Sequence, residues 1–147
     1  MTKFLLSVHV LAAIIAIGPV TVAASMFPAA IRHAGTGAGR DLAVPRSLHR
    51  ICRVYAALGI VVPVFGLATA NSLGVLGDPW LLTSIALTAA AAAVLVLAVL
   101  PRQRLLLATA DDTRAPARLA MFTGLFNILW AVVTVLMIVR PGSTTGA

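Results

Sequence analysis

The chain has 147 residues, of which 61% are hydrophobic and only 10% charged, and eleven basic residues against four acidic ones give a net charge of +7. This composition is typical of a protein dissolved in lipid and excludes an ordinary water-soluble globular domain. It also disfavours a nucleic-acid-binding role, because the arginines flank apolar tracts as the topology determinants of membrane proteins do.

Four uncharged apolar tracts predict four transmembrane helices, since each has the roughly 20 residues with which a helix crosses the hydrocarbon core. We place the spans at residues 4–27, 54–76, 80–100 and 118–139. The tracts lack the alternation of apolar and polar residues that membrane-spanning strands show. The connecting loops are short, so the sequence predicts a single all-α domain, residues 1–147, folded as an antiparallel four-helix bundle.

The first span follows Lys3 and contains His9. Its breaker pair Gly18-Pro19 imitates the end of a signal peptide, but the apolar tract continues to spanning length, so we keep the span, with cleavage as the alternative. His9 is the one ionisable residue inside a predicted span, which makes it a candidate cofactor-binding residue by default. We expect it to be a packed histidine that bonds to one of four polar groups on the second and third helices: Thr69, Asn71, Thr83 or Ser84.

The basic residues are divided unequally between the loops, with nine of the eleven in the first and third loops. The positive-inside rule therefore predicts that these two loops are cytoplasmic and that both termini and the second loop are outside. Ten of the eleven basic residues are arginine. Together with the abundance of alanine, this bias indicates a bacterial genome and hence the bacterial plasma membrane.

A helix is predicted to restart at Pro45 and to lead into the second span. Arg46, Arg50 and Arg53 share one face of it, where they are candidate ligands of an anionic lipid headgroup. The alternative is a solvated positive flank. Pro63 is expected to kink the second span and to free a carbonyl near Gly59, and Pro19 to kink the first span.

The rest of the chain adds packing signals. We expect the third helix to continue through residues 103–110 and the fourth to begin in the turn Asp111-Asp112-Thr113. Trp80 should anchor at the interface, whereas Trp130 and Asn127 should bond or pack inside the bundle. Small residues at helical spacing, which favour close helix packing, are Ala12 and Ala16, Gly66 and Ala70, Ala89–Ala93, and Ala120 and Gly124.

No catalytic set can be assembled, because no acid lies in a span and no Ser/His/Asp arrangement occurs. The single cysteine, Cys52, and the histidine spacing predict no metal site. Haem remains an alternative cofactor, because membrane four-helix bundles hold haem between facing ligands. His33 and His49 lie in the first loop, far from His9, so only Met137 is at a depth that would complete a pair with His9.

Several short motifs resemble the DUF2269 family of predicted bacterial integral membrane proteins. The residues that carry the resemblance are Lys3-Phe4-Leu5-Leu6, His9-Val10-Leu11 and Gly18 in the first span, Leu48-His49-Arg50 before the second, and Asn127, Trp130 and Arg140-Pro141-Gly142 in and after the fourth. The resemblance implies a four-helix membrane fold and assigns no activity. The opening is more distantly similar to CopD and HemJ-like proteins, by which His9 would match their first-helix histidine. The chain lacks the in-span lysine and the nearby tryptophan of the HemJ pattern.

Two functions follow as hypotheses. The leading one is a non-enzymatic helical bundle, embedded in the bilayer, that forms a homo-oligomer or serves as an accessory subunit of a membrane complex. The alternative is a haem- or quinone-linked membrane redox protein that uses His9.

Overall fold

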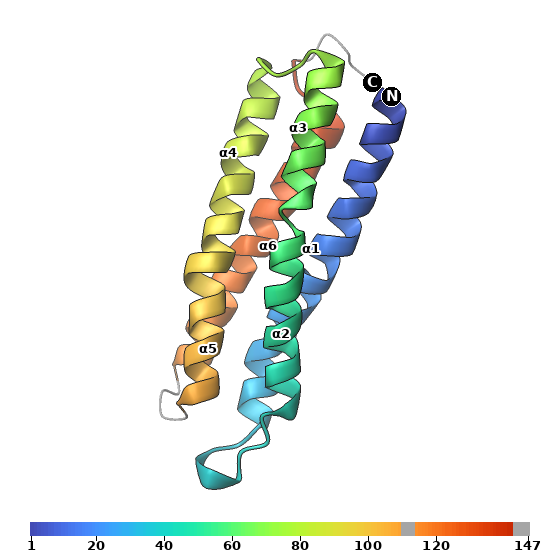
Figure 1. Cartoon of the computed structure of the whole chain (residues 1–147). Coiled ribbons are helices and arrows are strands. Elements are labelled where there is room, and N and C mark those ends of the chain that lie inside the picture. The colour runs from blue at the N-terminus through green and yellow to red at the C-terminus, as the bar shows by residue number, and fades with distance from the viewer. Residues whose placement is uncertain (110–113, 143–147) are drawn as a thin grey trace.

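The computed structural model describes residues 1–109 and 114–142, and every regular element in these ranges is a helix. The elements are α1 (Thr2–His33), η1 (Gly37–Gly39, a 3₁₀ turn), α2 (Ala43–Leu58), α3 (Val61–Leu73), α4 (Pro79–Ala93), η2 (Val94–Val99, a π-helical stretch), α5 (Leu100–Ala108) and α6 (Ala115–Val139). They form four rods: α1, α2–α3, α4–η2–α5 and α6 (Figure 1). All four are long and apolar enough to cross a membrane, which confirms the predicted all-α bundle.

Three of the rods extend well beyond the length that a bilayer requires. The first three have 32, 31 and 30 residues, whereas about 20 suffice to cross the hydrocarbon core. The excess lies at the arginine-rich end, where α1 continues to His33 and α2 begins at Ala43, ahead of the predicted second span. α5 continues the third helix as predicted but ends at Ala108, because Thr109 is already extended, whereas the prediction ran to residue 110. The predicted start of the fourth helix at Asp111–Thr113 lies outside the described residues.

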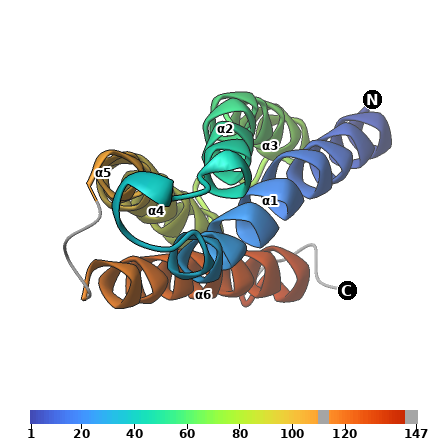
Figure 2. The same ribbon diagram turned by 90° about the horizontal axis from the view of Figure 1, so that it is seen from below.

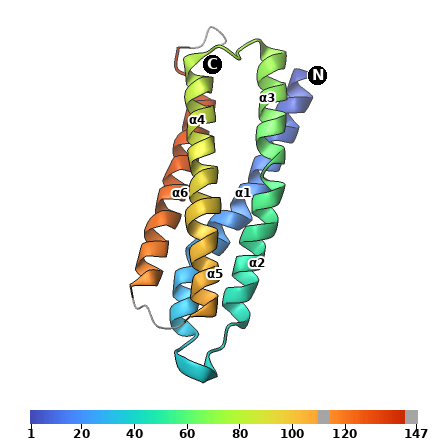
Figure 3. The ribbon, with the colours of Figure 1, turned by 60° about the vertical axis from the view of Figure 1, so that its left-hand side comes forward.

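The helix α1 crosses the bundle diagonally and lies between the other rods (Figure 2). It packs against α2 and α3 on one side and against α6 on the other, and α4 packs against α6. The main core therefore forms where α1, α2, η2 and α6 meet, around the fully buried Phe27, Phe126, Val99 and Cys52. At the opposite end α3 and α4 diverge although a short loop joins them (Figure 3). A smaller core around Trp80 closes this end.

The second rod is interrupted at Gly59 and Ile60, between α2 and α3. Pro63 explains the interruption, because it has no N–H to donate to the carbonyl of Gly59 four residues earlier. That carbonyl instead accepts from the N–H of Val62 at 3.1 Å, in a tighter turn. The carbonyl of Gly59, which the sequence predicted to be freed, is therefore satisfied locally by Val62. By contrast, α1 runs without interruption through Pro19.

The third rod changes its winding ahead of Pro101. The missing N–H of a proline in a helix leaves a carbonyl of the preceding turn without its donor. Here that turn widens into the π-helical stretch η2. Arg102 then donates from Nη1 to the carbonyl of Ala98 at 3.1 Å, and its guanidinium lies 4.1 Å from the ring centroid of Phe122 on α6. The arginine thereby ties the widened rod to α6.

Candidate functional site

His9 is a buried polar residue of α1, and it joins α1 to α3. Its side chain is 9% exposed, and its Nδ1 lies 2.9 Å from the backbone carbonyl oxygen of Val62. A carbonyl oxygen can only accept, so Nδ1 carries the proton and donates it. The ring lies directly over Gly66, where a Cβ would be only 2.9 Å from His9 Cε1. The missing side chain of Gly66 therefore makes the room that the imidazole occupies.

The expectation that His9 bonds to a hydroxyl or amide of the second or third helix is wrong. Thr69, Thr83 and Ser84 each donate to the carbonyl four residues earlier in their own helix, at 2.7 to 2.8 Å. Hydroxyls of short side chains commonly satisfy themselves in this way inside apolar helices. Asn71 is exposed.

A second polar joint lies at the arginine-rich end, between α2 and α5. His49 Nδ1 is 2.8 Å from Gln103 Oε1, and Gln103 Nε2 is 3.5 Å from Cys52 Sγ. Gln103 and Cys52 are fully buried and His49 is 8% exposed. The amide of Gln103 therefore bridges the imidazole and the thiol in a low-dielectric interior, where such bonds are strong and their loss is costly. Arg40 of the loop reaches the same helix, donating to the carbonyl of Leu106 at 2.8 Å.

The sequence analysis missed this joint. It placed His49 on the helix predicted to restart at Pro45, and the structure confirms that helix as α2, which begins at Ala43, but no partner was predicted for the histidine. The available signal was the three-residue spacing of His49 and Cys52, which puts both on one helix face. The partner of that face could not be identified, because Gln103 is 51 residues or more away along the chain.

The three arginines predicted to bind lipid headgroups lie on the outer side of α2. Arg46, Arg50 and Arg53 are exposed, while the opposite side of the helix buries Pro45, Leu48, His49 and Cys52. In the part of the chain that the structure describes, none of the three forms an ion pair with a carboxylate. Arg104 on α5 is likewise exposed.

The helix α6 carries a third group of polar residues at the middle of its length. Asn127 Nδ2 donates to Ser25 Oγ of α1 at 3.1 Å, which is the interhelical bond expected for Asn127. Trp130 packs edge-on against Phe126, with ring centroids 6.3 Å apart. Asn127 Oδ1, Trp130 Nε1 and Thr123 Oγ1 are buried without a hydrogen-bond partner among the described residues.

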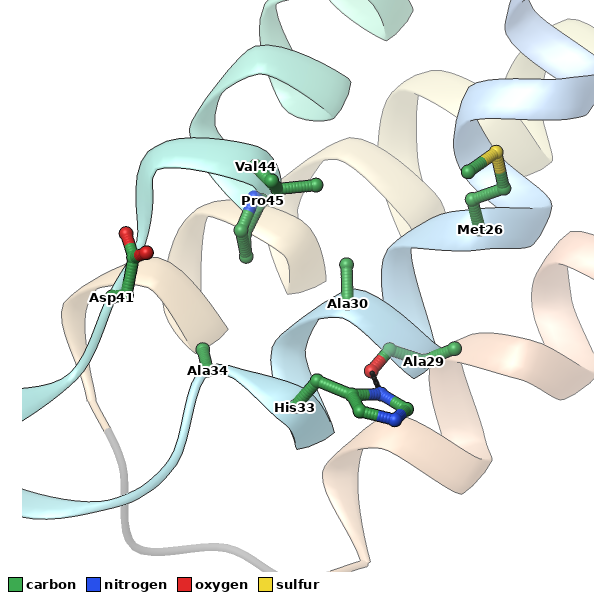
Figure 4. A pocket seen from close by; sticks show the side chains of 8 residues that line it. All are labelled: Met26, Ala29, Ala30, His33, Ala34, Asp41, Val44 and Pro45. Carbon is green, nitrogen blue, oxygen red and sulfur yellow. Dashed lines mark hydrogen bonds between the residues drawn. The ribbon is translucent and has the colours of Figure 1, made fainter.

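A shallow hollow of about 360 Å³ opens between the end of α1 and the start of α2 (Figure 4). Its wall is mostly apolar, formed by Met26, Ala30, Val44 and Pro45 among others. His33 turns back along α1 so that its Nδ1 lies 2.8 Å from the carbonyl of Ala29. Asp41 accepts from the N–H of Ala43 at 3.0 Å. The two polar side chains do not converge on a common point in the hollow (Figure 4).

His9 and Met137, the predicted haem pair, have the following neighbours in the structure. Met137 packs with the small core around Trp80, while His9 faces Gly66 and the carbonyl of Val62. Within residues 1–109 and 114–142, no three metal-ligating side chains of the His, Cys, Asp or Glu type come together.

The chain matches no protein-family model, no curated protein and no solved structure at a significant level. Its functional assignment therefore depends on the arrangement of the residues described above.

Proposed function

We propose that this chain is a small non-enzymatic protein of a bacterial plasma membrane, in which it self-associates or serves as an accessory subunit of a larger complex. The outer surface of α6 carries this proposal. Ala120 is exposed, and a Cβ at Gly124 would have no neighbour within 4 Å. Small residues that a helix does not use inside its own bundle allow a helix of another molecule to approach closely in the bilayer.

The buried polar side chains of His9 and Gln103 support the same proposal. His9 serves the joint of α1 with α3, and Gln103 serves the joint of α2 with α5. Both act as packing elements between helices, which is how buried polar groups commonly contribute in membrane bundles. A haem- or quinone-linked role for His9 has less support, because one ring nitrogen is engaged with Val62 and the ring is seated on Gly66. The motifs around Lys3 and His9 favour membership of the DUF2269 family.

Self-association should depend on the open surface of α6. Gly124→Leu is expected to weaken association about tenfold or more, because leucine would keep the second helix at a distance. Energy transfer between labelled copies in liposomes, diluted with lipid, measures the change. Ala68→Leu is the matched control, since Ala68 is exposed on α3, away from α6. Both variants should melt like the wild type.

Two outcomes would contradict this proposal. The first is equal energy transfer for Gly124→Leu and Ala68→Leu with no sign of a partner protein in gentle detergent extracts. The second is a Soret band in the absorbance spectrum of the purified protein that disappears in His9→Ala, which would establish the haem alternative.

The orientation that we propose puts the arginine-rich end in the cytoplasm and both termini outside. Cysteine labelling in intact cells tests it, and Cys52 gives little background because it is fully buried. A membrane-impermeant maleimide should label Gly77→Cys, in the loop between α3 and α4, and should not label Gly39→Cys, in the loop before α2. Both positions have open space around them. The reverse pattern would invert the orientation.

A further inference from the structure

Each member of the polar joint between α2 and α5 is followed in the sequence by an arginine. Arg50 follows His49, Arg53 follows Cys52 and Arg104 follows Gln103. We call Arg50, Arg53 and Arg104 the basic seam. The side chains of successive residues in an α-helix point in directions about 100° apart. The rods containing α2 and α5 run in opposite directions (Figure 3). In two antiparallel helices this difference in direction carries the residues that follow the contact to the same side of it, and in α2 and α5 these residues are the arginines.

The basic seam faces away from the core. All three arginines are exposed, whereas His49, Cys52 and Gln103 beneath them are buried. The bond between His49 and Gln103 holds the two helices together at this point, so arginines more than 50 residues apart in the chain lie on the same side of the contact between α2 and α5. Arg46 lies one helical turn before Arg50 and continues the same face of α2.

The basic seam also lies at the depth of the lipid headgroups. Val54–Leu73 has the about 20 residues that cross a hydrocarbon core, so Arg53 stands at its edge. The stretch from Trp80 to Val99 has a similar length, and Arg104 follows it by little more than one turn. Charged residues just outside the core meet phosphate groups of the bilayer surface.

The charges of the basic seam are not neutralised within the described residues. None of its arginines forms an ion pair with a carboxylate there. The acid nearest to Arg46 and Arg50 in the sequence is Asp41, which accepts the N–H of Ala43 at the start of α2. A guanidinium has planar pairs of donors that match phosphate oxygens, and several guanidinium groups on one side of a helix contact suit a single phosphate.

We propose that the basic seam binds the phosphate of an anionic phospholipid, at a site shared by α2 and α5. The polar joint of His49, Gln103 and Cys52 positions the arginines, and Arg104 is a ligand that α5 adds to the arginines of α2. This lipid site is independent of the self-association surface on α6.

Native mass spectrometry of the full-length protein, released from nanodiscs, tests this proposal. The nanodiscs contain phosphatidylcholine with or without phosphatidylglycerol. Wild-type protein should retain phosphatidylglycerol in preference to phosphatidylcholine. The double variant R53Q/R104Q should bind it more weakly, by about fivefold for each arginine removed. The control R32Q/R118Q removes the same charge from exposed arginines of α1 and α6 and should retain the lipid.

Melting of both double variants in pure phosphatidylcholine should match the wild type, which separates lost binding from misfolding. Equal loss of phosphatidylglycerol in both variants would mean that the total positive charge binds the lipid, with no contribution from a specific site, and would overturn the proposal. Equal retention of the two lipids by the wild type would also overturn it. Displacement of the bound lipid by millimolar inorganic phosphate would show a free-anion site in place of a lipid site.

Discussion

Replacement of Gly66 by valine is expected to lower the free energy of unfolding in detergent by about 1–3 kcal/mol, the usual cost of forcing extra carbons into a packed site. A Cβ at this position would lie 2.9 Å from Cε1 of His9 and 3.2 Å from Nδ1, so the ring must move. Its movement would also break the bond from Nδ1 to the carbonyl of Val62. Chemical unfolding, followed by the fluorescence of the two tryptophans, measures the loss.

The matched control for this prediction is Gly124→Val. The control adds the same isopropyl group at a position where a Cβ would have no neighbour within 4 Å, so it should leave the stability of the monomeric protein near the wild-type value. The double variant Gly66→Val with His9→Ala should recover part of the loss, because the smaller side chain vacates the space. Equal stability of both glycine variants would show that His9 is not seated on Gly66.

Replacement of Gln103 by leucine should also destabilise the protein, by about 1–3 kcal/mol, because it leaves the buried imidazole of His49 without a partner. Leucine is close to glutamine in volume, so the change removes the hydrogen bonds without opening a large cavity. His49→Leu combined with Gln103→Leu should be much less harmful than Gln103→Leu alone, since replacing both partners with apolar groups can be nearly neutral.

The control for the second joint is Cys52→Ala, which removes the acceptor of Gln103 Nε2 at 3.5 Å and leaves the bond between Gln103 and His49 in place. Comparison of Cys52→Ala with Gln103→Leu then separates the two bonds of Gln103. His49→Leu, Gln103→Leu and the double variant form a double-mutant cycle. If the losses in unfolding free energy of the two single variants add up to the loss of the double variant, the two side chains do not interact.

Some features of the molecule could be read from particular residues without a structure. The uncharged tracts around Phe4, Val54 and Leu119 predicted the helical rods, because lipid leaves a backbone no alternative to internal hydrogen bonds. Pro63 predicted the disturbance of the second rod, which the structure shows at Gly59, where the carbonyl accepts from Val62 in a tighter turn. Asn127 predicted a bond between helices, which the structure forms with Ser25.

The partners of the buried histidines could not be read in the same way. His9 bonds to a backbone carbonyl, and a carbonyl leaves no mark in the sequence, whereas the hydroxyls that seemed better partners are satisfied by their own helices. His49 falls on the helix predicted from Pro45, but its partner Gln103 lies 54 residues further along the chain on another helix, and nothing in the sequence pairs the two.

The sequence by itself therefore determined the fold class, the number of membrane-spanning helices and the arginine-rich end, since these depend on local composition and on the thickness of the bilayer. Only the tertiary structure decided that His9 is seated on Gly66 and that Gln103 joins α2 to α5. These contacts depend on how the rods rotate about their own axes. That rotation is set by the shape of many side chains at once, and the near-uniform hydrophobicity of transmembrane helices carries little periodic signal to reveal it.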